Sequence, residues 1–147
     1  LVVSLAGVFA FSLSTLGVID PITRAIVNSG LGETGILALL IVMLLVLGMF
    51  LDGISILLIF VPLLAPLMLH FQWDVVWFGV LLVLTVAIGQ FTPPMAVNLM
   101  VASKIAAVRM EQTTRWVIWL VLAMCVAMLL VAVFPQIALW LPQRLGY

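Results

Sequence analysis

Long runs of apolar residues, broken only by short polar interruptions, constrain the fold of this chain more than any other feature. Five such runs cover residues 1–19, 36–51, 54–69, 76–103 and 116–134. An ordinary globular domain carries ~25% charged residues, which cover its surface in water. Here only 7% of the 147 residues are charged, so lipid is the solvent that suits the chain. The sequence therefore predicts an all-α, polytopic membrane protein, because backbone groups in lipid are satisfied within helices.

The second and third runs are short, and only Asp52 and Gly53 separate them. As helices the two arms would each measure ~24 Å, which falls short of the ~30 Å hydrocarbon core. Two short arms around one polar turn predict a re-entrant helical hairpin over residues 36–70, with both ends on one side of the membrane and the tip inside the protein. The alternative is a pair of short but complete spans in a thin bilayer.

The fourth run would form a helix of ~42 Å, too long for one straight span, and it is interrupted. The interruption contains Gly89, Gln90, Thr92, Pro93 and Pro94. Because proline has no N–H, Pro93 and Pro94 cannot donate to the carbonyls of Gly89 and Gln90, and Gly89 loosens the backbone further. Two carbonyls without donors and the Thr92 hydroxyl are hard oxygen ligands that suit Na⁺, and broken helices form such sites in secondary transporters. The alternative is a plain proline kink satisfied by neighbouring helices.

Asp52 is the only acid inside an apolar run, and an ionisable residue at membrane depth is a candidate for ion or proton coupling. The favoured alternative is that Asp52 caps the helix that begins after it. Gly48, Gly53 and Ser55 surround the same turn and would let backbones approach closely. Asn98 follows the proline pair and would form a hydrogen bond across helices, which makes Ser55 and Asn98 candidates for substrate contact or packing.

The charges predict the orientation, because Lys104, Arg109 and Arg115 lie together between the fourth and fifth runs. By the positive-inside rule this loop is cytoplasmic, so the hairpin opens to the periplasm and the C-terminus is periplasmic. Four regions follow: a transmembrane helix with an interfacial connector (1–35), the re-entrant hairpin (36–70), a broken transmembrane helix (71–104), and a final transmembrane helix with a periplasmic tail (105–147).

Enzyme classes fit poorly. A membrane aspartyl protease needs two facing acids, and Asp52 is the only acid in an apolar run. A rhomboid-type serine site needs a histidine in the membrane, whereas the single histidine, His70, lies at an interface. We therefore expect no enzyme and no cofactor, and the remaining alternative to a transporter is a non-transporting membrane scaffold or assembly subunit.

The order of these features resembles the large membrane (M) subunit of TRAP transporters, the tripartite ATP-independent periplasmic transporters of bacteria and archaea. The resemblance rests on LGMFLDGISILLIFVPLLAPLM, WFGVLLVLTVAIGQFTPPMAVNLMVASKIA and FPQIALWLP, and covers about residues 36–142. It implies an elevator-type fold of two inverted repeats, each with a re-entrant hairpin and a broken helix. This chain would hold the second repeat, in the C-terminal part of the subunit, and the N-terminal repeat would be missing.

The resemblance also implies that Na⁺ lies between hairpin tip and broken helix. In this sequence that points to Leu51, Asp52 and Gly53 at the tip, and to Gly89, Thr92, Pro93 and Pro94 at the break. Where the family usually has Val-Gly after the prolines, this chain has Met95 and Ala96, so the family's backbone path and contacts are not carried over to that segment. The implied partners are a periplasmic substrate-binding protein and a small membrane (Q) subunit. The implied activity is Na⁺ symport of an organic acid, of the C4-dicarboxylate or sialic acid type, across the bacterial or archaeal inner membrane.

Overall fold

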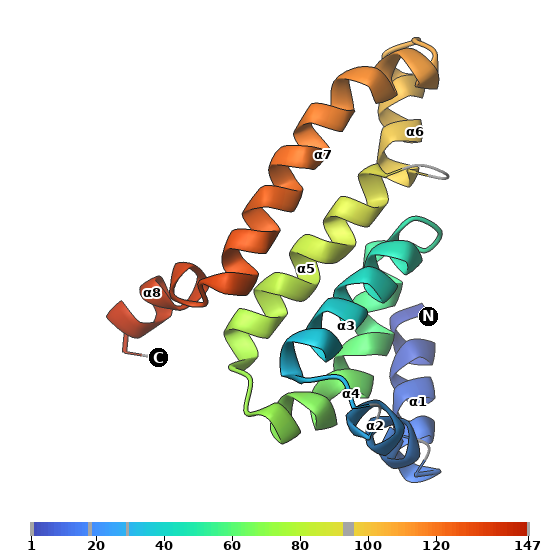
Figure 1. Cartoon of the computed structure of the whole chain (residues 1–147). Coiled ribbons are helices and arrows are strands. Elements are labelled where there is room, and N and C mark those ends of the chain that lie inside the picture. Colours follow the sequence, from blue (N-terminus) through green and yellow to red (C-terminus); the bar gives the residue numbers. More distant parts are fainter. Residues whose placement is uncertain (1, 18, 29, 93–95, 147) are drawn as a thin grey trace.

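The computed structural model describes residues 2–17, 19–28, 30–92 and 96–146, and these residues fold into helices joined by short turns (Figure 1). The all-α class expected from the sequence is confirmed. In chain order the helices are α1 (Val2–Thr15), α2 (Ile19–Val27), α3 (Glu33–Gly48), α4 (Gly53–Phe71), α5 (Val75–Phe91), α6 (Val97–Ile105), α7 (Met110–Val133) and α8 (Gln136–Arg144).

Helices α3, α4 and α5 pack against one another and form the core. On α3 the buried side chains recur every four residues, at Ile36, Leu40 and Leu44, so one stripe of this helix faces its neighbours. Leu81 and Ile88 of α5 are each only 1% exposed and belong to the same apolar cluster. The opposite sides of these helices stay apolar and uncovered, which suits a lipid environment.

The turn between α4 and α5 is set by local sequence. Gln72 ends α4 in the left-handed conformation, with φ of 55°, and the Trp73 N–H then donates to the Met68 carbonyl at 3.0 Å. Asp74 begins α5, because its Oδ1 accepts hydrogen bonds from the N–H groups of Val76 and Trp77 at 2.8 and 3.1 Å. The chain therefore reverses sharply, and α5 runs back along the α3–α4 pair (Figure 1).

A hydrogen bond joins the two ends of the α3–α4 hairpin. Trp73 Nε1 donates to the Glu33 carboxylate at 2.7 Å, although the two residues are 40 positions apart in sequence. The Trp73 ring also stacks on Phe71 and Phe78, with centroids 5.1 and 5.3 Å away. The start of α3 and the end of α4 thus lie at the same end of the molecule, as a helical hairpin requires.

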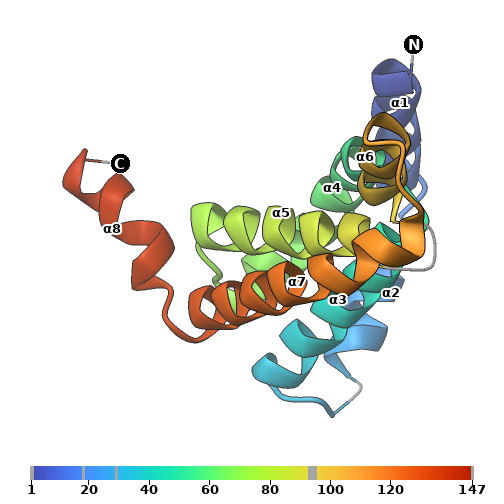
Figure 2. The same cartoon turned by 90° about the horizontal axis from the view of Figure 1, so that it is seen from above.

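Helix α7 runs beside both α5 and α6 (Figures 1 and 2). The indole Nε1 of Trp77, near the start of α5, donates to the Val131 carbonyl near the end of α7 at 2.7 Å. Helix α7 begins at Met110, well before the start expected at residue 116, because the polar residues that precede Trp116 continue the helix. The tail after Phe134, for which the sequence analysis gave no secondary structure, forms α8.

Two helices among the described residues are long and apolar enough to cross a bilayer, Gly53–Phe71 and Gln112–Val133. Helices α3 and α5 are equally apolar but shorter. Pro62 and Pro66 both lie inside α4.

Candidate functional site

The tip of the α3–α4 hairpin is a tight turn followed by a capped helix. Helix α3 ends at Gly48, and the Leu51 N–H still donates to the Leu47 carbonyl at 2.9 Å. Asp52 is the N-cap of α4, because its Oδ2 accepts a hydrogen bond from the Ser55 N–H at 2.9 Å. The capping interpretation of Asp52 is therefore confirmed. Capping does not exclude a second role, since a carboxylate has further lone pairs.

The helix break begins after Phe91, and one expectation about it is wrong. The Gly89 carbonyl is not without a donor, because the Thr92 N–H donates to it at 3.0 Å. With proline next in the sequence, the last available N–H closes a tighter, three-residue turn instead. The Thr92 hydroxyl donates to the Ile88 carbonyl at 2.7 Å. Its oxygen keeps lone pairs for another partner.

Pro93 and Pro94 lie outside the described residues. The state of the Gln90 carbonyl, which depended on Pro94, therefore stays a prediction. The chain is described again from Ala96, which has a left-handed backbone with φ of 40° and begins α6. This conformation is uncommon for a residue with a side chain, and it lets the second half of the broken helix start in a new direction.

Gly48 and Gly89 bring the backbones of the hairpin tip and the break close together. A Cβ added to Gly89 would lie 2.7 Å from the Gly48 Cα and 2.8 Å from the Leu45 carbonyl oxygen. A Cβ added to Gly48 would lie 3.1 Å from the Gly89 Cα. The expectation that Gly48 permits close backbone approach is confirmed. Gly89, which was expected to loosen the backbone, instead packs directly against α3 and keeps the break beside the tip.

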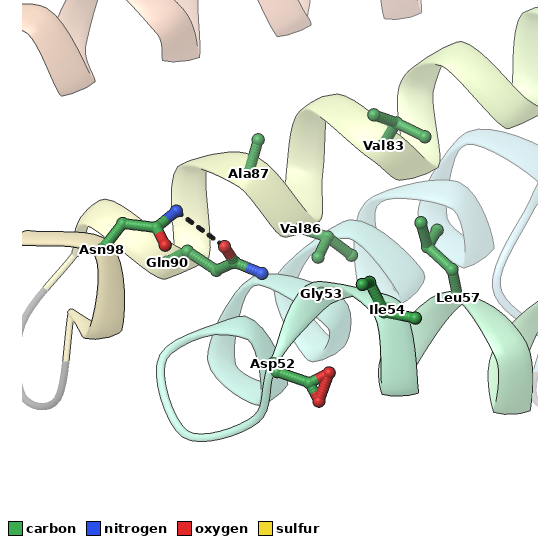
Figure 3. Close-up of a pocket in the computed structure, with 9 residues that line it drawn as sticks. All are labelled: Asp52, Gly53, Ile54, Leu57, Val83, Val86, Ala87, Gln90 and Asn98. Carbon is green, nitrogen blue, oxygen red and sulfur yellow. Dashed lines mark hydrogen bonds between the residues drawn. The ribbon is translucent and has the colours of Figure 1, made fainter. Parts of the chain in front are cut away.

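A cavity of about 350 Å³ lies between the start of α4 and the end of α5 (Figure 3). Its polar lining comes from Asp52 at the tip, Gln90 at the end of α5 and Asn98 on α6. Its apolar wall includes Leu57 of α4 and Val86 of α5. This volume is near the lower end of the ~300–1,000 Å³ typical of small-molecule sites. The fold thus brings together candidates from both interruptions of the sequence.

The amide groups of Gln90 and Asn98 are joined across the break. Asn98 Nδ2 donates to Gln90 Oε1 at 2.7 Å. On its other side the Gln90 amide lies against Gly53, where an added Cβ would collide with the Gln90 nitrogen. The expectation that Asn98 forms a hydrogen bond across helices is therefore confirmed.

Not all predicted residues reach this cavity. Thr92 lines a separate cavity of about 130 Å³, together with Val117 and Val121 of α7. Leu51 is 42% exposed at the outside of the turn. Ser55, a candidate for substrate contact, is not among the residues that line the cavity. Its backbone N–H donates to the Asp52 carboxylate that caps α4.

Sequence reasoning missed the apolar wall of the tip cavity. Val83 and Val86 both line this wall. They precede Gln90 by seven and four positions, the spacing of one helix face. The spacing of these two valines relative to Gln90 was therefore the sequence signal that could have identified the apolar wall.

Comparison with known proteins defines the class. A family model, the tripartite ATP-independent periplasmic transporter, DctM component, matches residues 1–137. The chain belongs to this family of transporter permeases, and the resemblance seen in the sequence is confirmed.

Three relatives illustrate the similarity. The chain is 40% identical to the sialic acid TRAP transporter large permease protein SiaM of Vibrio cholerae over 113 residues, 76% of this chain and 26% of the relative. It is 32% identical to the C4-dicarboxylate TRAP transporter large permease protein DctM of Rhodobacter capsulatus over 145 residues, 99% of this chain and 33% of the relative. It is 32% identical to the isethionate TRAP transporter permease protein DctMQ of Oleidesulfovibrio alaskensis over 137 residues, 93% of this chain and 22% of the relative. The chain thus spans a third or less of the length of these relatives.

Proposed function

We propose that this chain is part of the large permease subunit of a TRAP transporter that takes up an organic acid with Na⁺ as the coupling ion. Membership of the DctM family supports the transport role. The relatives are named for sialic acid, C4-dicarboxylates and isethionate, which are all acids that ionise at neutral pH. The observation that carries the proposal is the tip cavity, which a carboxylate and two amides line at a helix interruption.

The ion would bind where the tip approaches the break. The oxygen ligands proposed for Na⁺ are the Asp52 carboxylate, the Gln90 carbonyl, and the second lone pair of the Gly89 carbonyl, whose first lone pair accepts the Thr92 N–H. The Thr92 hydroxyl, which lines the neighbouring cavity beside α7, is proposed as a further ligand. Leu51, Gly53, Pro93 and Pro94 would shape the surrounding backbone. Hard oxygen donors of this kind suit a small, hard cation, and half-helix ends supply them in secondary transporters.

Charge gives a physical reason for coupling. An acid bound in the tip cavity would bring its negative charge near the Asp52 carboxylate. Two like charges ~5 Å apart repel by roughly 3 kcal/mol at an effective dielectric constant of ~20. A sodium ion between them replaces this repulsion by attraction, so the acid binds well only after Na⁺. Transport of the acid would then require Na⁺, and transport of Na⁺ would require the acid.

The length of α3 supports a re-entrant arrangement, whereas α4, with 19 residues, is longer than the arm expected from the sequence and long enough to cross a bilayer. Helix α3 measures ~24 Å and its tip ends beside the break between α5 and α6, whereas α7 measures ~36 Å and continues alongside α6 (Figure 1). A bilayer core of ~30 Å that matches α7 would enclose the tip. The turn between α6 and α7, flanked by Lys104 and Arg109, would be cytoplasmic. The α4–α5 turn at Trp73 and α8 would be periplasmic.

The remaining parts of the mechanism follow from the family. We propose that hairpin and broken helix move together through the membrane as an elevator. The partners would be a periplasmic binding protein, a small membrane subunit and the other inverted repeat of the same subunit. The complete transporter, and not this chain alone, would carry out uptake.

The test is uptake by the full-length permease, reconstituted in proteoliposomes with its small subunit and binding protein. Radiolabelled sialic acid, succinate and isethionate serve as probes, each with an inward Na⁺ gradient or with K⁺ in its place. We expect uptake of one of these acids only with Na⁺. Asp52→Asn keeps a good helix cap but loses the charge. It should raise the Na⁺ concentration for half-maximal uptake about tenfold, which corresponds to ~1.4 kcal/mol. Equal uptake in Na⁺ and K⁺ would exclude sodium coupling, and assembly without any uptake would favour a scaffold.

A further inference from the structure

The Gln90 side chain is held in one orientation by its neighbours. Its Oε1 accepts the hydrogen bond from Asn98 Nδ2 at 2.7 Å, so this oxygen is directed toward α6. The amide nitrogen is therefore directed the other way, toward Gly53 and the hairpin tip (Figure 3). Because Gly53 has no side chain, the amide fits between α5 and the start of α4. The group that Gln90 offers to the tip cavity is thus a hydrogen-bond donor.

A donor in this position suits an oxygen anion better than a cation. Among the described residues that line the cavity, the carboxylate is that of Asp52, and it is directed away from Gln90 (Figure 3). One of its oxygens is held by the Ser55 N–H at the beginning of α4. The N–H groups at the start of α4 therefore already have an anionic partner, the Asp52 carboxylate. On the α5 side of the cavity, the Gln90 amide nitrogen remains as a donor.

The remainder of the cavity is apolar. Val83, Val86 and Ala87 of α5 form the wall beside Gln90, and Ile54 and Leu57 face them from α4. Such a wall fits the carbon skeleton of a small molecule, while the amide fixes its polar end. The arrangement is that of a site with one directed donor and an apolar wall beside it.

From this geometry we infer that Gln90 is a specificity-determining residue whose amide nitrogen donates a hydrogen bond to the carboxylate or sulfonate of the transported acid. Asn98 is a positioning residue, because its hydrogen bond sets which end of the Gln90 amide faces the cavity. This inference rests on the proposed function, since it assumes that the acid occupies the tip cavity. It adds a residue role that the sodium mechanism does not require.

Two variants of the full-length permease test the role of the donor. Gln90→Glu keeps the shape and the oxygen facing Asn98 but replaces the donor by a second, negatively charged acceptor. Gln90→Met keeps the length and removes polarity without adding charge. For the acid that the parent takes up, we expect each variant to raise KM at least tenfold, equivalent to ~1.4 kcal/mol. For Gln90→Met, which adds no charge, the Na⁺ concentration for half-maximal uptake, measured at saturating acid, should stay within twofold of the parent.

A third variant tests the positioning role. Asn98→Asp removes the donor that faces Gln90 Oε1, so the Gln90 amide must turn its nitrogen toward the new carboxylate and its oxygen toward the cavity. KM for the acid should rise, although Gln90 itself is unchanged. Gln143→Glu in α8 makes the same chemical change as Gln90→Glu far from the cavity, and it should leave KM at the parent value. Protection of each solubilised variant from thermal unfolding by the same acid gives a binding readout independent of uptake.

The possible results separate the two proposals. If Gln90→Glu keeps the parent's KM, or shifts only the sodium requirement, Gln90 acts as an ion ligand or as packing and the inference is wrong while sodium-coupled uptake stands. If Gln90→Glu is poorly assembled, Gln90→Met decides by the same criterion. A parent without sodium-dependent uptake of any of the three acids would overturn both proposals.

Discussion

Replacement of Gly89 by alanine tests whether close contact between helices holds the break beside the hairpin tip. The new Cβ would lie 2.7 Å from the Gly48 Cα, 2.8 Å from the Leu45 oxygen and 2.9 Å from the Gly48 carbonyl carbon. All three are backbone atoms, so no side-chain rotation relieves the collision and α3 and α5 must separate. Overpacking of this kind costs ~1–3 kcal/mol. Gly89→Ala should therefore lower the melting temperature of the solubilised full-length permease and weaken its response to Na⁺.

Gly79→Ala is the matched control in the same helix. A Cβ at Gly79 meets no atom within 4 Å, so the substitution adds no collision. Alanine is favoured over glycine inside a helix by ~0.5–1 kcal/mol, and this variant should be neutral or stabilising. The two variants should thus differ by about 2 kcal/mol or more in the free energy of unfolding. If Gly89→Ala melts and transports like Gly79→Ala, the contact does not hold tip and break together.

Three further predictions concern the hairpin base, the break and the orientation. Trp73→Phe keeps the aromatic stack but removes the hydrogen bond to Glu33, and should cost about 1–2 kcal/mol in thermal or denaturant unfolding; an unchanged melting curve would contradict a role for this bond. Thr92→Val removes the hydroxyl but keeps the shape, and should raise the sodium requirement of uptake with normal expression, whereas an unchanged requirement would exclude Thr92 as a ligand. Alkaline phosphatase fused after Tyr147 should be active, because the C-terminus is expected in the periplasm, and an inactive but stable fusion would invert the orientation.

The local interruptions of the chain were predictable because each acts through its own residues. A short polar turn at Asp52 and Gly53 between two apolar arms predicted a hairpin, and the Asp52 carboxylate caps α4 as its position suggested. A proline pair after Gly89 predicted the end of α5, since proline removes the N–H groups that would extend the helix. These are rules of one or two helical turns, which a sequence displays directly.

The contacts that assemble the site were not all predictable, because they depend on how the helices pack. The bond between Glu33 and Trp73 joins residues that are far apart in sequence. The approach of Gly89 to Gly48 depends on the positions along α3 and α5 at which the two helices pack against each other. Thr92 was expected to face the tip, but it lines the cavity beside α7. Periodicity indicates that a helix face is buried, but it does not identify the neighbour that buries it.

The most direct test of the central proposal asks whether sodium and the acid together protect the tip cavity. Ile54 lines this cavity and is 67% exposed, so Ile54→Cys places a reactive thiol there. In the full-length permease, Cys125 of α7 and any cysteine in the rest of the subunit would first be replaced by alanine, and the reaction of the thiol at position 54 with a small methanethiosulfonate reagent would be timed. We expect Na⁺ together with the transported acid to slow the reaction strongly, and K⁺ with the same acid to leave it fast. Equal rates under both conditions would contradict the proposal that the ion and the acid meet at the hairpin tip.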